Sequence, residues 1–223
     1  MRYMLVLTMV LILYSCSQQT EPETTSHAEA GLNGELSDVY EGYKNAVLNG
    51  NGEGAAYYVS SQTIIYYDKL LDLVQNADSS KLVLAGLFEK FTVLAIRQTV
   101  DWARLRAMNG KDLFIYAIQN GMIGKNISKT SLGDVEYKND HFTKGELMAN
   151  KKPTGKYMLF YREDGRWRLD LLDMLRENGK NLDKMMGHPE LNETQRMVLF
   201  FKQVFGREPS REIWLPVKLY NKI

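Results

Sequence analysis

A histidine paired with a carboxylate is the combination in this sequence that could carry acid–base catalysis. The chain has three histidines, and His141 is the one that falls within a predicted β-strand. Paired with an acid such as Asp101 or Asp170, it could act as a general base that the carboxylate orients. The alternative interpretation is a solvated histidine on an edge strand. His141 is therefore the catalytic candidate.

Aromatic residues and one arginine could serve binding instead of catalysis. Tyr66 and Tyr67 are adjacent in a predicted helix, and Tyr57 and Tyr58 precede them. These rings could stack on a flat ligand, or they could form a half-buried helix face with hydroxyl groups at its rim. Arg97 ends an apolar helix and could face a buried acid or solvent. Tyr66, Tyr67 and Arg97 are the ligand-binding candidates.

Composition and motifs argue against several other classes of protein. Lys and Arg total 28 against 27 Asp and Glu, so no excess of positive charge favours binding to nucleic acid. One cysteine and three histidines give little basis for a disulfide framework or a metal site. The sequence contains no phosphate-binding loop, dinucleotide-binding glycine motif, nucleophile elbow or zinc-protease helix. We expect no cofactor and no bound metal.

The elements that must position these residues begin with a series of helices. Apolar residues recur at spacings of three and four, and clusters of glycine, asparagine or serine separate the segments. Asn109 and Asp112 have the spacing of a capping box at one helix start. The predicted helices cover residues 35–48, 53–59, 63–75, 81–98, 101–107 and 111–120.

The pattern then changes to the alternation typical of β-strands. Asp164 and Gly165 stand between two alternating segments, which is a strong signal for a two-residue hairpin turn. Asn139 and Asp140 mark an earlier turn. The predicted hairpins pair 135–138 with 141–148, and 156–162 with 166–171.

The second hairpin has one face that must pack as core and one that is mixed. Pairing Glu163 with Arg166 fixes the register, and side chains then alternate between the faces. Arg168 could stack on Tyr161 on the mixed face. The core face carries Met158, Phe160, Trp167, Leu169 and Leu171, with Arg162 at its end, and the mixed face carries Tyr157, Leu159, Tyr161, Arg168 and Asp170.

The order of helices followed by this sheet resembles the nuclear transport factor 2-like superfamily, of the SnoaL-like kind. Residues 163–169 carry an ending common in its last strands: an acidic residue, Asp-Gly, one residue, Trp, one residue and Leu. The small-residue loop and Ala-Ala pair at 49–56 and the Tyr66-Tyr67-Asp68 helix extend the likeness over 35–172. The resemblance implies an α+β fold in which helices pack on a curved antiparallel sheet to form a cone.

The chain beyond residue 172 is an appended helical extension, 173–223. Its predicted helices are 173–186 and 192–205, and Asn192 and Gln195 form a capping pair at the start of the second. The second helix has too many apolar residues to stand alone in water. We expect it to dock with Trp214 on the mixed face of the sheet or across the mouth of the cone. In the resembling superfamily the mixed face is often a dimer interface, so a homodimer is the alternative.

The N-terminus resembles the export signal of bacterial lipoproteins. An apolar segment, 4–13, is too short to span a membrane but suits a signal sequence. It leads into Leu13-Tyr14-Ser15-Cys16, which resembles a lipobox, in which the cysteine is acylated after cleavage. The alternatives are an ordinary secretory signal, in which Cys16 is incidental, and an uncleaved anchor. This implies a signal peptide at 1–15, membrane attachment through acyl chains on Cys16, and a place in the bacterial cell envelope facing the periplasm or the exterior. The polar residues that follow predict a flexible tether at 16–34.

Three functions fit these features. The first is a lipid-anchored, non-catalytic module that binds a ligand or a partner protein. The second is a lipid-anchored enzyme of the cyclase, isomerase or dehydratase type, because enzymes of the resembling superfamily place Asp with His or Tyr in the cone, and His141 would be its base. The third is a structural or partner-binding subunit without a small-molecule pocket. The fold does not decide between them.

Overall fold

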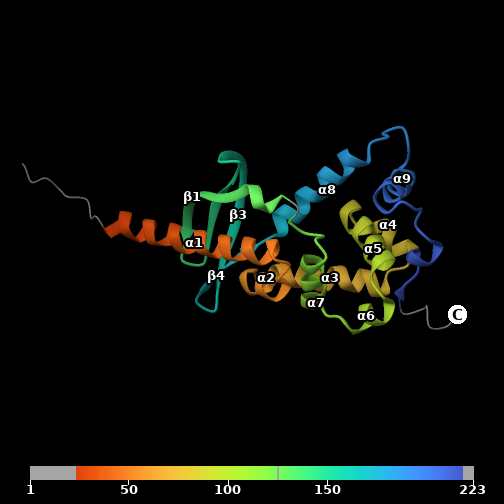
Figure 1. Cartoon of the computed structure of the whole chain (residues 1–223), viewed down its shortest axis with the longest axis horizontal. Coiled ribbons are helices and arrows are strands. Elements are labelled where there is room, and N and C mark those ends of the chain that lie inside the picture. The colour runs from red at the N-terminus through yellow and green to blue at the C-terminus, as the bar shows by residue number, and fades with distance from the viewer. Residues whose placement is uncertain (1–23, 125, 218–223) are drawn as a thin grey trace, which may run out of the picture.

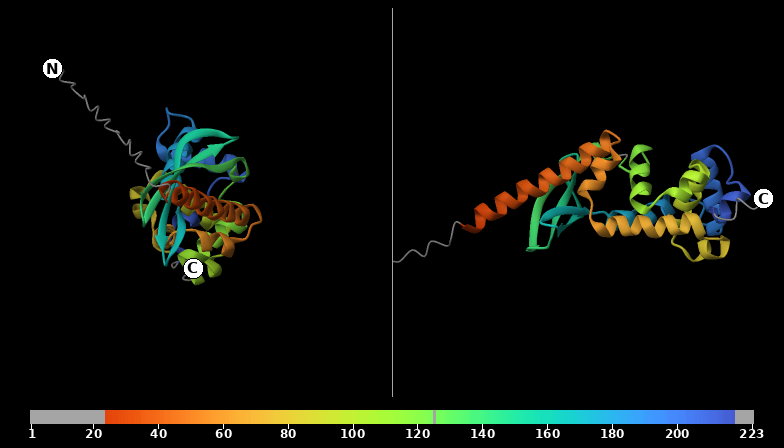
Figure 2. Two further views of the ribbon diagram at one scale, coloured as in Figure 1. Left: turned by 90° about the vertical axis from the view of Figure 1, so that its left-hand side faces the viewer. Right: turned by 90° about the horizontal axis from the view of Figure 1, so that it is seen from below.

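The computed structural model describes residues 24–124 and 126–217 and has an α+β fold, as the sequence predicts. Within this part of the chain a four-stranded antiparallel sheet lies toward one end of an elongated molecule, and most of the helices extend from it toward the other end (Figure 1). Figure 2 shows that α1 (Thr24–Leu48) runs past the sheet and that α9 (Glu193–Phe205) lies at the far end.

Helices occupy the sequence before the sheet, as expected, and side chains cap several of their N-termini. Asn109 and Asp112 form the predicted capping box, and Asn192 and Gln195 form the second one. After α1, the helices before the sheet are α2 (Gly52–Tyr58), α3 (Ser61–Asn76), α4 (Ser79–Leu84), α5 (Leu87–Thr99), α6 (Trp102–Ala107), α7 (Gly110–Gln119) and the short 3₁₀ helix η1 (Ile127–Lys129).

The prediction of a single helix at 81–98 is wrong, because the helical backbone is interrupted between α4 and α5. Ala85 and Gly86 both have extended backbone conformations there, and Gly86 is the N-cap of α5. A Cβ atom on Gly86 would lie 2.3 Å from a carboxylate oxygen of Glu89, which has turned back toward the cap. The continuous helical periodicity gave no sign of this break.

The sheet is a meander in which each strand pairs with the next along the chain. Glu163 pairs with Arg166 and Phe160 with Leu169, which confirms the predicted register of the second hairpin. The first and third strands begin earlier than predicted, because bulges between Leu132 and Val135 and after Leu147 interrupt the alternation, whereas the other two lie within one residue of their predicted bounds. The strands are β1 (Thr130–Asn139), β2 (Phe142–Ala149), β3 (Lys152–Glu163) and β4 (Arg166–Asp170).

The inner face of the sheet packs as core against α1. The five residues predicted to be buried there, Met158, Phe160, Trp167, Leu169 and Leu171, are all buried. Leu36, Tyr40 and Tyr43 are the matching buried residues of α1. The Tyr40 and Thr130 hydroxyl oxygens lie 2.6 Å apart and fix the helix to β1.

The outer face of the sheet differs from the prediction in its aromatic contacts. Arg168 does not stack on Tyr161; its guanidinium lies 5.6 Å from the ring centre of Tyr57 and donates to the Tyr57 carbonyl. Tyr161 packs instead on Phe142, with ring centres 5.0 Å apart. The reason is that the junction between α2 and α3 runs along the edge of β4, where Val59 forms a parallel bridge with Leu169.

The described part of the C-terminal extension docks on the folded domain, as expected, but α9 packs on another helix and not on the mixed face of the sheet, so the predicted location on the sheet is wrong. After α8 (Leu172–Met186), the helix α9 packs its buried residues on Phe91 of α5, whose ring centre lies 5.3 Å from that of Phe200. Lys90 and Glu193 form an ion pair of 2.5 Å between the same two helices. The 3₁₀ helix η2 (Arg211–Trp214) also contacts α5. An apolar stripe on α5 therefore supplies the partner that the extension needs.

The predicted tether is shorter than the sequence suggested. The helix α1 begins at Thr24, so residues 24–34 are helical in continuation of 35–48. The signal peptide, 1–15, and the remaining tether residues, 16–23, which include Cys16, lie outside the described residues. The polar composition of 24–34 misled the prediction because their helix continues one that is anchored in the core at Leu36.

Replacing Gly34 by alanine should stabilise the protein by about 0.5–1 kcal/mol. Glycine costs this much inside a helix relative to alanine, and a Cβ on Gly34 meets no atom within 4 Å. The control is Gly50→Ala, where a φ of +63° makes alanine strained and destabilising. Chemical denaturation measures both changes, and an unchanged stability for Gly34→Ala would show that the tether does extend to residue 34.

Candidate functional site

The catalytic candidate His141 is exposed at the turn between β1 and β2. Its backbone amide donates to the Asn139 side chain, and its carbonyl accepts from the amide of Arg162. Among residues 24–124 and 126–217, no hydrogen bond or ion pair joins its imidazole ring to a carboxylate. The structure therefore does not bring His141 together with either of its proposed partners.

The two proposed carboxylates have structural contacts of their own. Asp101 is the N-cap of α6 and accepts from the amide of Arg104. Asp170 is buried, where it accepts from the Ser60 hydroxyl at 3.1 Å and from the amide of Leu172 at 2.8 Å. The bond from Ser60 ties the start of α3 to the end of β4.

Arg97 is buried and binds backbone carbonyls, so it meets neither of the two environments expected for it. Its guanidinium donates to a carbonyl of η2 at 3.0 Å and to three at the C-terminal end of α3 at 2.6–2.9 Å. Burial lowers the pKa of Arg97 to about 10, so it remains charged at neutral pH. Its positive charge also complements the negative end of the α3 dipole. The four acceptors are Leu73, Val74, Ala77 and Ile213.

The tyrosine candidates separate into core and cavity residues. Tyr67 is buried in edge-to-face contact with Phe114, and burial raises its pKa well above the ordinary value. Tyr57 lies at the surface against Arg166. Tyr66 points from the same helix as Tyr67 but from a different face, and it lines a cavity. Arg97 also borders a cavity, of about 400 Å³, but its guanidinium is already bound to backbone carbonyls, so Tyr66 is the candidate considered further.

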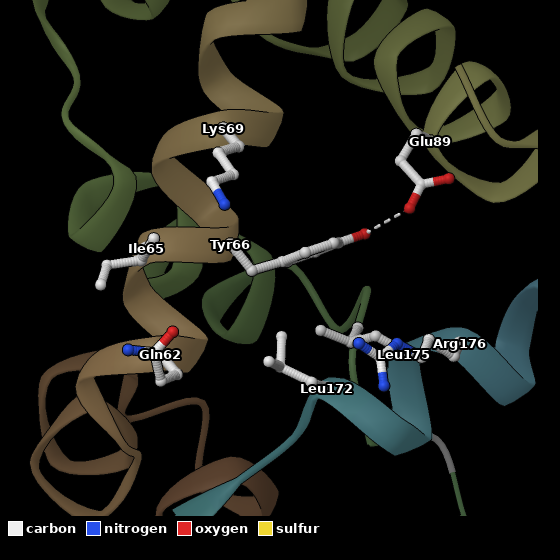
Figure 3. Close-up of a pocket in the computed structure, with 8 residues that line it drawn as sticks. All are labelled: Gln62, Ile65, Tyr66, Lys69, Glu89, Leu172, Leu175 and Arg176. Atoms are coloured by element: carbon white, nitrogen blue, oxygen red, sulfur yellow. Dashed lines mark hydrogen bonds between the residues drawn. The ribbon is translucent and has the colours of Figure 1, made fainter. Parts of the chain in front are cut away.

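This cavity, called here the Tyr66 cavity, lies between α3, α5 and α8 and has a volume of about 210 Å³ (Figure 3). One face of α3 supplies half of its lining, at spacings of three and four residues that place side chains in a row. The first turn of α5 supplies a carboxylate, and the first turns of α8 supply apolar groups and a guanidinium. The lining residues are Gln62, Ile65, Tyr66, Lys69, Glu89, Leu172, Leu175 and Arg176.

A hydrogen bond crosses the cavity from α3 to α5. The Tyr66 hydroxyl donates to Oε1 of Glu89 at 3.3 Å, as Figure 3 shows. Burial and the negative charge of Glu89 raise the pKa of Tyr66, so its hydroxyl stays protonated at neutral pH. The bond holds the tyrosine ring across the space between the helices and aims the carboxylate toward it.

Sequence reasoning identified one residue of the Tyr66 cavity and missed the rest. The row Gln62, Ile65, Tyr66 and Lys69 has helical spacing and could have been recognised as a mixed face of α3. Glu89 and Arg176 come from helices far along the chain, and no local signal connects them with Tyr66.

Two further features of the described residues bear on function. Within 24–124 and 126–217, no three His, Cys, Asp or Glu side chains are grouped so as to hold a metal ion. No helix in this part of the chain has the length and apolar character needed to cross a membrane.

Comparisons with known proteins return nothing. The sequence matches no protein-family model, and neither curated proteins nor solved structures give a significant match. The geometry of the Tyr66 cavity therefore carries the functional argument.

Proposed function

We propose that this protein is a binding module of the bacterial cell envelope that holds a small ligand in the Tyr66 cavity without transforming it. The observation that carries the proposal is the composition of the cavity wall, where one aromatic ring and three aliphatic side chains meet a few polar groups. Ligand sites in proteins combine an apolar lining with a small number of polar groups in this way. The order of helices before a meander sheet supports, as part of the same proposal, a relationship to the nuclear transport factor 2-like superfamily.

The placement of the acid–base candidates favours binding over catalysis. His141 lies on a hairpin turn, whereas the cavity is formed by helices, so the proposed base and the ligand site are separate. In the cavity, the raised pKa of Tyr66 makes its hydroxyl a hydrogen-bond donor and a poor proton acceptor. The enzyme alternative therefore has its proposed base, His141, away from the site where a ligand would sit.

Membrane attachment through Cys16 is the second part of the proposal. Changing Cys16 to alanine should prevent processing by the lipoprotein route and move the protein out of the membrane fraction. Several acyl chains anchor stably at about 0.8 kcal/mol per buried methylene, and the nearly neutral chain offers no charge attraction as a substitute. Fractionation and N-terminal mass spectrometry measure the change. Unchanged membrane association with an unmodified N-terminus would contradict the anchor.

A variant that fills the cavity tests ligand binding. Ile65 lines the cavity but is 40% exposed, so Ile65→Trp should block the space without disturbing the core. Full-length protein purified from bacterial membranes in mild detergent should release a small molecule on denaturation, detected by mass spectrometry, and Ile65→Trp should release at least roughly tenfold less.

The matched control is Val83→Trp on α4, where the side chain is 68% exposed and outside the cavity. It should release as much of the molecule as the unchanged protein does. Equal release from all three proteins, or release from none of them, would contradict the proposed function.

A further inference from the structure

The charged groups of the Tyr66 cavity come from three different walls. Lys69 stands on α3 and Arg176 on α8, whereas Glu89 stands on α5. Arg176 also pairs with Asp173 at 3.0 Å, but both side chains are exposed, and such surface pairs contribute little. Among the described residues, the ammonium group of Lys69 makes no ion pair or hydrogen bond. The cavity thus presents two cationic groups and one carboxylate to whatever enters it.

Glu89 retains capacity to accept further hydrogen bonds. An ionised carboxylate offers about four acceptor positions. Within the described part of the chain, the hydroxyl of Tyr66 is the one hydrogen-bond donor that the Glu89 carboxylate has. A ligand with an ammonium group could therefore bind Glu89 without displacing Tyr66. A ligand with negative charge alone would meet repulsion at this wall.

Apart from Gln62, the other lining residues are apolar or aromatic, and the space is small. Leu172 and Leu175 from α8 lie on one side of the Tyr66 ring from α3. The volume of about 210 Å³ is below the roughly 300–1,000 Å³ of pockets that enclose drug-sized molecules. The ligand is therefore small and carries an apolar part beside its charges.

We infer that the Tyr66 cavity binds a small zwitterion with an apolar side chain, of the α-amino-acid class. The ammonium group binds Glu89, the carboxylate binds Lys69 and Arg176, and the side chain packs on Leu172 and Leu175. Charge-assisted hydrogen bonds at both ends select a ligand that carries both charges. This inference rests on the proposed function, because it names the ligand class of the same cavity.

Calorimetric titration of the purified full-length protein tests the inference with three probes of similar shape. Leucine has both charged groups, isovalerate lacks the ammonium group, and isoamylamine lacks the carboxylate. We expect leucine to bind and each analogue to bind at least roughly tenfold more weakly. Isovalerate leaves Glu89 without an ammonium partner, and isoamylamine leaves Lys69 and Arg176 without a carboxylate partner.

Paired variants assign the two charges to their walls. Glu89→Gln should weaken leucine binding at least roughly tenfold and leave isovalerate binding no weaker. Lys69→Gln should weaken both leucine and isovalerate. The controls are Glu53→Gln and Lys111→Gln, which alter an exposed ion pair of 2.9 Å outside the cavity and should change nothing.

The outcomes separate this inference from the proposed function. If leucine and isovalerate bind equally and Glu89→Gln affects neither, the zwitterion is wrong and a cavity for anions remains. If no probe binds while Ile65→Trp still abolishes release of a native ligand, the inference fails and the proposed function stands. If no probe binds and Ile65→Trp changes nothing, both fail.

Discussion

Replacing Phe201 by alanine should lower the free energy of unfolding by roughly 3–5 kcal/mol, the cost typical of removing a fully buried phenylalanine. Phe201 has no exposed surface, and its ring centre lies 6.1 Å from that of Phe91 on α5 and 4.3 Å from that of Phe205. The loss would show that α9 is an integral part of the fold. Urea denaturation followed by circular dichroism measures it.

The control for Phe201 lies on the same helix. Leu199 is 44% exposed, so Leu199→Ala should cost less than about 1 kcal/mol. Deleting the chain after Gly187 should have a larger effect and cause aggregation, because it uncovers Phe91 and removes the Ile213 carbonyl from Arg97. If the truncated protein stays monomeric with its melting temperature unchanged, the extension is a separate arm, and the partner-binding subunit becomes the better function.

Changing Arg97 to methionine should destabilise the protein by roughly 3–5 kcal/mol. Its guanidinium donates to four backbone carbonyls, and a buried carbonyl left without a donor costs roughly 1–3 kcal/mol. The expected total is less than the cost of four unsatisfied carbonyls. A neighbouring cavity of about 400 Å³, lined in part by Arg97 and Trp102, can admit water to hydrogen-bond some of them. Arg97→Lys should restore only part of the loss, since an ammonium group cannot reproduce the planar fork of donors.

The cost of losing Arg97 should not depend on pH between 6 and 9. Burial lowers its folded-state pKa to about 10, so the unfolded chain holds more protons only between this pH and the higher pKa of the unfolded chain. Stability would rise with pH in that interval and stay flat below it, where both states are protonated. The control is Arg104→Met, which removes an exposed side chain and should cost less than about 1 kcal/mol. A loss at Arg97 no larger than this control would contradict its role.

Local signals in the sequence predicted the local parts of the fold correctly. Asp164 and Gly165 fixed the register of the second hairpin because only the turn and the alternation of side chains decide it. The capping boxes at Asn109 and Asn192 depend on residues three positions apart, and both form. The overall α+β arrangement followed from the change of period along the chain.

Features that depend on tertiary contacts were not predictable in this way. The partner of α9 could not be deduced, because several apolar faces were available to it. For Arg97 the sequence suggested a buried acid or solvent as the partner. Its acceptors are instead backbone carbonyls, which every residue has, so the sequence cannot distinguish them. The Tyr66 cavity needs Glu89 and Arg176 on separate helices, and a single sequence does not show that these helices meet.

The measurement that tests the central claim most directly is a nuclear magnetic resonance titration of the protein with a pool of small amphipathic fragments. If the Tyr66 cavity is the ligand site, saturable shifts of the backbone amides should cluster at Gln62, Lys69, Glu89 and Arg176, and Ile65→Trp should abolish them. Two results would contradict the claim. One is a cluster of shifts on the outer sheet face, around Tyr157 and Tyr161, and the other is the absence of saturable shifts anywhere in the protein.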